Sequence, residues 1–360
     1  MVKAVQMVKK NAEKEALTAI DLFSGCGGLT LGLKKAGFHV IGAVELNRLA
    51  AETYRRNHSA VTLWESDIRE LDPAVIKKEL GLKKRELALL AGCPPCQGFS
   101  RLRTMNGAFV VDDPRNDLLF EFARFVEVFL PQAIMMENVP WLANDKRFSV
   151  FVERIWAMGY RGEYRVLDAA DFGVPQRRKR LIFLAGLKGS IPFADPVKKR
   201  LTVWDAISHL PVAGKSGDPL HDLLSVHQPR IREIIRNIPK DGGSRTSLPK
   251  KLWLECHRHV SRGFKDVYGR MAWDSVAPTI TSGCFNPSKG RFLHPEEDRA
   301  ITLREAAILQ GFPKRYYFPA DNRSAVGTMI GNALPPPFIT AHARAVRVFL
   351  STSKGRKATS

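Results

Sequence analysis

The residue with the clearest chemical potential is Cys96, in the run GCPPCQGFS at 92–100. A cysteine thiolate is both a strong, soft nucleophile and a metal ligand. Pro95 fixes its own φ and restricts the residue before it, so the backbone leading into Cys96 is stiff. An apolar run at 87–91 predicts a short buried strand just before the motif. Ligands of open α/β sheets bind outside the carboxyl ends of strands, so the thiol stands where chemistry usually takes place.

Three other interpretations of this cysteine pair compete with a nucleophile. A zinc site needs more ligands, and no second cysteine pair with ligand spacing occurs in the sequence. A redox pair is disfavoured because two prolines lie inside the motif and the surroundings are not thioredoxin-like. A buried strand end without a chemical role also stays open, so the nucleophile interpretation needs support from elsewhere in the chain.

Charged side chains also stand at the ends of two other predicted strands. Glu137 follows the apolar run 133–136, and a carboxylate at the end of a buried strand is costly unless it has a partner or a task. Arg178 and Arg180 lead into the strand predicted at 181–185, and strand alternation places them on the same side. They could therefore share one cleft. The competing interpretations are a solvated loop edge for the glutamate and a solvated strand edge for the arginines.

A glycine-rich turn near the N-terminus predicts a nucleotide-type site. A strand at 17–23, the turn SGCGG at 24–28, a helix at 29–36 and a strand at 39–44 precede Glu45. Glycines let the backbone approach a ligand closely, and an acid about twenty positions further on can accept both ribose hydroxyls.

The turn departs from the dinucleotide fingerprint, because Thr30 stands where the third glycine would be. A nucleoside without phosphates therefore fits better than a pyrophosphate. Asp67, which follows the apolar run 61–64, could accept a hydrogen bond from an adenine amino group. S-adenosylmethionine satisfies all of these features.

Charge is the strongest global signal. The chain has 360 residues, long enough for one large domain and a smaller one, and 56 basic residues against 36 acidic ones leave a net charge of +20. Such an excess indicates a polyanionic partner, most often nucleic acid, although a basic surface kept for solubility is the alternative. No apolar run could span a bilayer, residues 1–16 lack a signal core, and five cysteines form no disulfide framework. We therefore expect a cytoplasmic protein without membrane attachment.

The pattern of the chain changes near Lys188. Up to there, strands and helices alternate, including an amphipathic helix predicted at 116–130. Beyond it, Pro, Gly, His and basic residues are scattered through 192–289, which indicates a second, less regular domain. Helical spacing returns at 303–309 and again at 338–350, and the basic Ser/Thr tail that follows is expected to be disordered.

These motifs resemble, in order, those of the cytosine-C5 DNA methyltransferases of the bacterial modification type. The resemblance runs from residue 17 to about residue 350, and six motifs in family order make coincidence negligible. The matching runs are DLFSGCGG at 21–28, PPCQ at 94–97, ENV at 137–139, Gln176-x-Arg178-x-Arg180, REAA at 304–307 with LQGFP at 309–313, and Gly331-Asn332.

The resemblance implies an α/β fold: a Rossmann-like, S-adenosylmethionine-dependent methyltransferase sheet of six parallel strands and one antiparallel strand, plus a smaller irregular target-recognition domain. The large domain would be discontinuous. The expected parts are an N-terminal extension at 1–16, a catalytic and cofactor domain at 17–190, a target-recognition domain at 191–300, a hinge segment at 301–325, a returning part of the catalytic domain at 326–350, and a disordered basic tail at 351–360.

The resemblance also assigns roles to residues. It makes Cys96 the nucleophile and Glu137 the group that engages the cytosine edge, and it implies that Arg178 and Arg180 hold the base and the catalytic carboxylate. The implied cofactor contacts are Phe23, Gly25, Gly27, Glu45, Asp67, Pro95, Leu118 and Asn332, and the implied DNA contacts are Gln97, Ser100, Arg101 and Thr279. No metal is expected.

The implied activity is sequence-specific transfer of a methyl group from S-adenosylmethionine to C5 of cytosine in double-stranded DNA, with Cys96 adding covalently to C6 of a flipped-out base. The expected partner is DNA, with a restriction endonuclease acting on the same site as a further partner, and the expected state is a monomer. A tRNA cytosine-C5 methyltransferase of the same fold and a non-catalytic DNA-binding relative are the alternatives. Non-catalytic relatives typically lose the cysteine or the glutamate, and both are present here.

Overall fold

The chain divides into two compact units in a computed structural model that describes residues 17–95, 118–258 and 266–355. The first unit takes its described residues from 1–167, 179–195 and 338–360, and the second from 168–178 and 196–337. This division differs from the predicted boundaries, because the chain returns to the first unit at Phe338 and not at residue 326. The reason is packing: helix α12 (Leu303–Leu309) lies against α13 (Arg323–Asn332), α8 (Val203–Ile207) and α9 (Pro219–Asp222) of the second unit.

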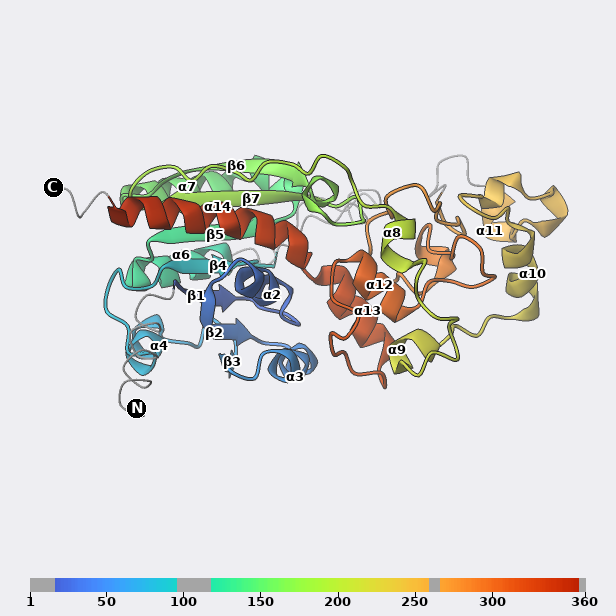
Figure 1. Cartoon of the computed structure of the whole chain (residues 1–360), viewed down its shortest axis with the longest axis horizontal. Helices are drawn as coiled ribbons and strands as arrows, with labels where there is room; N and C mark the ends of the chain where they lie inside the picture. Colours follow the sequence, from blue (N-terminus) through green and yellow to red (C-terminus); the bar gives the residue numbers. More distant parts are fainter. Residues whose placement is uncertain (1–16, 96–117, 259–265, 356–360) are drawn as a thin grey trace, which may run out of the picture. The chain divides into compact units, whose positions relative to one another are not determined.

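The first unit is built on a seven-stranded sheet with strand order β3-β2-β1-β4-β5-β7-β6 (Figure 1). The β1–β2, β2–β3, β1–β4 and β4–β5 pairs are parallel, and the β5–β7 pair is antiparallel. The predicted mostly parallel α/β sheet with an antiparallel strand is thereby confirmed. The strands are β1 (Thr18–Leu22), β2 (His39–Glu45), β3 (Thr62–Glu65), β4 (Leu89–Gly92), β5 (Ala133–Asn138), β6 (Arg161–Asp168) and β7 (Lys179–Gly186).

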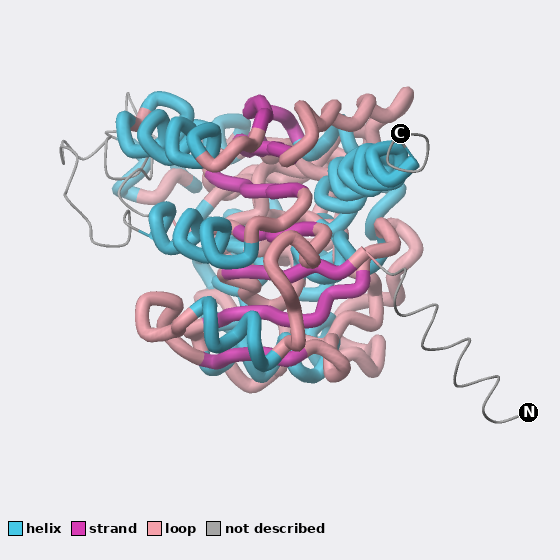
Figure 2. Tube along the Cα trace, turned by 90° about the vertical axis from the view of Figure 1, so that its left-hand side faces the viewer, coloured by secondary structure: helices cyan, strands magenta, loops and turns pink. Residues whose placement is uncertain are grey.

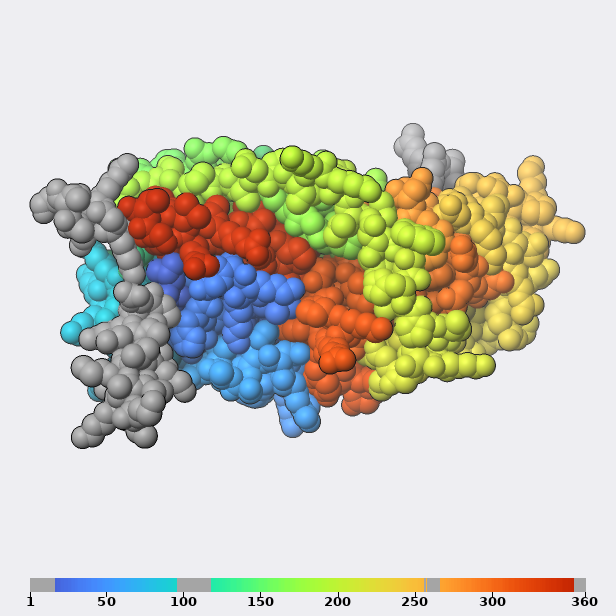
Figure 3. Space-filling view, viewed as in Figure 1, coloured from blue at the N-terminus to red at the C-terminus, as the bar shows by residue number. Residues whose placement is uncertain are grey.

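Helices cover both faces of this sheet, as Figure 2 shows with the strands between them. On one face α6 packs against both α4 and α7, and on the other face α2 and α14 lie together. Thr340 of α14 donates to the carbonyl of Gly32 in α2 at 3.2 Å, and this hydrogen bond joins the two helices, which lie together in Figure 3. The bounds are α2 (Gly28–Lys35), α3 (Arg48–Asn57), α4 (Pro73–Glu79), α6 (Leu118–Phe129), α7 (Lys146–Ala157) and α14 (Pro336–Gly355).

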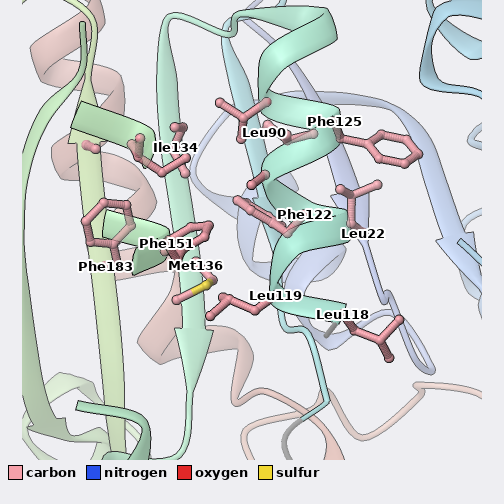
Figure 4. Close-up of a cluster of buried hydrophobic side chains, with 14 of the residues drawn as sticks. Leu22, Leu90, Leu118, Leu119, Phe122, Phe125, Ile134, Met136, Phe151 and Phe183 are labelled. Carbon is pink, nitrogen blue, oxygen red and sulfur yellow. The ribbon is translucent and has the colours of Figure 1, made fainter. Parts of the chain in front are cut away.

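The core under α6 holds the central strands in place (Figure 4). Phe122 lies 6.1 Å from the ring of Phe151, whose ring in turn lies 5.7 Å from that of Phe183 on β7. Burying each such side chain contributes about 1.5–3 kcal/mol. Phe122 also closes the space around Gly92, where a Cβ would lie 2.8 Å from the carbonyl oxygen of Leu22. Gly92, the first residue of the motif, therefore has no room for a side chain.

Two predicted elements are longer than expected. Strand β5 does not stop at Met136 but includes Glu137 and Asn138, because both pair with β7. Helix α14 begins inside the proline run, where the fixed φ of proline suits a first turn, and continues to Gly355. The first part of the tail predicted to be disordered is thus helical. Among the described residues, no helix is long and apolar enough to cross a bilayer.

The second unit is dominated by loops, short helices and 3₁₀ turns. Its longest helix besides α13 is α10 (Pro229–Asn237), and α11 (Glu255–Arg258) is a single turn. The guanidinium of Arg270, which is fully buried, donates to the backbone carbonyls of Ile235, Ile238, His294 and Glu297. The buried guanidinium thereby links several segments of this unit, as strand pairing links the strands of the sheet.

Candidate active site

Four predicted site residues, Cys96, Gln97, Ser100 and Arg101, lie outside the described residues. The described part of the cysteine motif ends at Pro95. The described groups around the start of the motif come from β4, β5 and β7 and form the candidate site.

The register of the sheet brings the start of the cysteine motif next to the predicted acid. Gly92 at the end of β4 pairs with Met136 of the parallel strand β5, so the residues that follow each of them are neighbours. The thiol of Cys93 donates to Oε2 of Glu137 at 2.7 Å. The side-chain amide of Asn138 donates to the carbonyl of Pro94 at 2.9 Å. Two side-chain contacts thus join the motif to β5.

Glu137 forms a buried ion pair. Its side chain is only 2% exposed, and its Oε1 lies 2.9 Å from Nε of Arg180 on β7. A buried carboxylate needs such a partner, because leaving it uncompensated is strongly unfavourable. The alternative of a solvated loop edge is therefore wrong for Glu137. The thiol of Cys93 thus hydrogen-bonds Oε2, and the charged guanidinium of Arg180 lies beside Oε1.

Arg178 makes its hydrogen bonds elsewhere, within the second unit. Its guanidinium donates to the carbonyl of Ile280 at 3.0 Å and to that of Gly331 at 2.8 Å, and its backbone N–H donates to Asp168. The side chain is buried, so the solvated-edge interpretation is also wrong here. Strand alternation predicted that the two arginines act together, yet Arg178 precedes β7 and stabilises loops of the other unit.

A neighbouring glutamine supports the same loops. The side chain of Gln176 is fully buried, accepts from the backbone N–H of Ile280 at 2.8 Å and donates to the carbonyl of Leu309 at 3.3 Å. Thr279, a predicted DNA contact, is exposed, and its hydroxyl donates to the carbonyl of Arg177 at 2.7 Å.

The predicted cofactor acid is oriented by backbone N–H groups. Glu45 at the end of β2 accepts from the N–H of Gly25 with Oε2 and from the N–H of Asn47 with Oε1, both at 2.7 Å. Burial raises the pKa of the Glu45 carboxyl group. Gly25 has φ of +55° and Gly27 of +95°, values in the left-handed region that favours glycine. A Cβ at Gly25 would meet nothing within 4 Å, so open space adjoins the turn.

A polar chain under the glycine turn was not anticipated from the sequence. Asp21 is fully buried, and its Oδ2 accepts from both the N–H and the hydroxyl of Thr30, at 3.0 and 2.7 Å. The hydroxyl of Thr30 also hydrogen-bonds that of Tyr54 at 2.8 Å. Burial raises the pKa of Asp21 to about 7. The available signal in the sequence was Thr30, which stands where the third glycine would be and brings a hydroxyl next to Asp21.

The remaining predicted cofactor residues are described and belong to different elements. Both oxygens of Asp67 accept from the guanidinium of Arg69, and this hydrogen bonding lowers the pKa of Asp67. Phe23 adopts φ of +61°, Leu118 is a buried residue at the start of α6, and Asn332 is an exposed residue at the end of α13 in the second unit. Among the described residues, no group of three or more His, Cys, Asp or Glu side chains could hold a metal ion.

The family follows from comparison with known proteins. Residues 17–347, nearly the whole chain, match the family model of the C-5 cytosine-specific DNA methylases. The chain belongs to this family. Type II methylase M.HgiDII of Herpetosiphon aurantiacus is 35% identical to this DNA methylase over 347 residues, covering 92% of this chain and 95% of that protein. Type II methyltransferase M1.HphI of Haemophilus parahaemolyticus is 36% identical over 339 residues, covering 92% and 87%.

Solved structures share the fold of this DNA methylase. A protein encoded in an Escherichia coli prophage, proposed to be a DNA modification methyltransferase, superposes with a TM-score of 0.71 at 24% identity, covering 93% of this chain and all of that one. Entamoeba histolytica methyltransferase EhMeth superposes with a TM-score of 0.64 at 16% identity, covering 93% and 99%. The predicted family, the DNA cytosine-5 methyltransferase class and the Rossmann-like fold are confirmed.

Proposed function

We propose that this methyltransferase transfers a methyl group from S-adenosylmethionine to C5 of a cytosine within a specific sequence of duplex DNA. The observation that carries the proposal is the buried pair of Glu137 and Arg180 beside the start of the cysteine motif. A carboxylate held by donors at a strand end is suited to hydrogen-bond one edge of a base.

The described residues around the glycine turn fit a nucleoside cofactor. Glu45 is held with both oxygens fixed, which suits ribose hydroxyls, and open space adjoins Gly25. When bound, S-adenosylmethionine supplies an activated methyl group on a sulfonium. The residues that would hold it are Phe23, Gly25, Gly27, Glu45, Asp67, Pro95, Leu118 and Asn332.

The residues of this chain would prepare the base for methylation. The Cys96 thiolate forms a bond to C6 of the cytosine, and the electron pair of the C5–C6 double bond moves toward C5. In its protonated form Glu137 donates its O–H to N3 of the cytosine and accepts from the exocyclic amine, which favours cytosine over thymine. Arg180 keeps Glu137 oriented, whereas Arg178 donates to the carbonyls of Ile280 and Gly331 in the second unit. After methylation, loss of the C5 proton restores the double bond and expels Cys96.

We assign DNA binding to the excess of basic side chains, which gives the chain a net charge of +20, and to the second unit. The target base has to leave the stack before a thiol can reach it, which costs a few kcal/mol that phosphate contacts offset. We assign sequence recognition to the irregular second unit, with Gln97, Ser100, Arg101 and Thr279 near the extruded base. A cognate restriction endonuclease, a monomeric state and action at the nucleoid belong to the same proposal.

The test uses purified protein, unmethylated duplex DNA of many sequence contexts and labelled S-adenosylmethionine. We expect labelled 5-methylcytosine, covalent trapping on DNA that carries 5-fluorocytosine at the target, and bisulfite sequencing reads that define one recognition site. Full activity of the Cys96→Ala variant would contradict the mechanism. Faster methylation of tRNA than of duplex DNA in a competition assay would instead favour the tRNA alternative.

A further inference from the structure

Cys93, in the described part of the cysteine motif, contacts the carboxylate of Glu137 with its own side chain. We propose that Cys93 is a positioning residue, whose thiol holds the carboxyl group of Glu137 in the orientation that engages the base. This inference rests on the proposed function, because it concerns the same glutamate.

The contact comes from a position that the backbone determines closely. Gly92 is paired in the sheet, and the N–H of Cys93 donates to the carbonyl of Leu22 at 3.2 Å. One residue further on, the carbonyl of Pro94 accepts from Asn138. The backbone of Cys93 is therefore held on both sides, and its side chain points at the neighbouring strand. A hydrogen bond of 2.7 Å from its Sγ to Oε2 of Glu137 results.

An ion pair at one oxygen and a hydrogen bond at the other restrict the rotation of a carboxylate. Arg180 faces Oε1 and Cys93 faces Oε2, while the side chain of Glu137 is 2% exposed and has little water to replace a lost donor. Arg180 supplies the charge, and the thiol supplies a weak neutral donor. Each carboxylate oxygen has a second lone pair, so Oε2 can accept from Cys93 and still accept from the base.

This role predicts a different result for each substitution of Cys93. Cys93→Ser keeps a donor at nearly the same place, whereas Cys93→Ala removes it and leaves one oxygen of a buried carboxylate with a missing contact. Hydrogen bonds to charged groups are among the stronger ones. We expect Cys93→Ala to lower kcat about tenfold with little change in KM for DNA, and Cys93→Ser to remain within about threefold of wild type.

The pH profile separates positioning from packing. Loss of a donor disfavours the charged form of the carboxylate and raises its pKa. Because Glu137 acts on N3 in its acid form, the alkaline limb of the profile of kcat/KM moves to higher pH in Cys93→Ala and returns toward the wild-type position in Cys93→Ser. A cysteine that only fills space would change stability without moving this limb. Thermal unfolding of each variant accompanies the kinetics.

A double-mutant cycle completes the experiment. Single-turnover methylation of duplex DNA is measured for wild type, Cys93→Ala, Glu137→Gln and the double variant, all as full-length protein. If Cys93 acts through Glu137, Cys93→Ala has no further effect in the Glu137→Gln background. An equal loss in both backgrounds, or a Cys93→Ala variant with wild-type kcat and pH profile, would overturn the inference alone. A wild-type protein that forms no 5-methylcytosine overturns the proposed function and this inference with it.

Discussion

The two units position their polar groups in different ways. In the first unit, Glu137 and Arg180 lie on neighbouring antiparallel strands, and the pairing of Glu137 with Ile182 determines how close the two charges come. In the second unit, Arg270 and Arg178 are buried among loops and donate to backbone carbonyls. Regular strand pairing therefore holds the charges of the sheet, whereas buried arginine side chains supplement the irregular backbone hydrogen bonds of the loops.

The two units should therefore be sensitive to different kinds of substitution. A substitution at a charged residue of the sheet should change chemistry and leave the fold intact, because the strands remain paired through their backbones. A substitution at a buried cation of the second unit should change the fold, because several carbonyls lose their donor at once.

The largest expected effect is on activity in the first unit. Glu137→Gln should lower the methylation rate by about 10²–10⁴-fold, because a positioned acid–base group contributes about that much. The melting temperature should fall, because the mostly buried guanidinium of Arg180 loses its charged partner, although glutamine keeps an acceptor toward it. The control is Glu163→Gln, which changes an exposed glutamate on β6 that pairs with Arg165. Equal rates for the two variants would show that Glu137 has no part in the reaction.

The next effect is on the stability of the second unit. Arg270→Met should lower the free energy of unfolding by about 3–5 kcal/mol, because four carbonyls and Asp298 lose a buried donor. The measurement is denaturant unfolding, with Arg232→Met on the exposed face of α10 as the control. A loss below about 1 kcal/mol would mean that the loops hold together without this cation.

The third effect is a pH-dependent change of up to about 4 kcal/mol in the free energy of unfolding, and it comes from Asp21. Its folded pKa of about 7 lies above the ordinary value of 3.8, so the folded state holds the proton more tightly than the unfolded state. This contribution is fully present below pH 4, and stability falls as the pH rises through 7. Asp21→Asn should therefore gain stability relative to wild type between pH 4 and pH 7.

The measurement for Asp21 is the difference in unfolding free energy between variant and wild type at several pH values, which removes the titrations that both proteins share. Asparagine can still accept from Thr30 through its carbonyl oxygen. A difference that stays flat with pH would show that Asp21 ionises normally in the fold.

The smallest effect tests the start of α12. The hydroxyl of Thr302 accepts from the N–H of Glu305, whose carboxylate accepts in return from the N–H of Thr302. The same hydroxyl also hydrogen-bonds Nδ1 of the buried His221 at 2.9 Å. Thr302→Ala should therefore cost about 2 kcal/mol in unfolding free energy, with Thr328→Ala on α13 as a threonine control. A cost as large as that of Arg270→Met would show that the second unit depends on its helix ends as much as on its buried cation.

The elements that the sequence predicted correctly are those whose residue pattern lies in one contiguous stretch. The strand, glycine turn, helix and acid at 17–45 form a contiguous pattern, and β1, α2 and β2 appear where that pattern placed them. Strand β5 was predicted too short because glutamate and asparagine are poor strand formers, and only pairing with β7 keeps Glu137 and Asn138 extended. The return to the first unit at Phe338 was likewise missed, since α13 belongs with loops that are distant in sequence.

Motif order and hydrophobic period are properties of the chain alone, and they were enough to predict the family, the class of sheet and the residue types expected at the site. The partners of those residues could not be predicted in this way. Cys93 meets Glu137 across 44 positions, and Arg178 reaches Gly331 across 153. Such contacts depend on strand register and on the burial of charge, and both arise only when distant segments pack together.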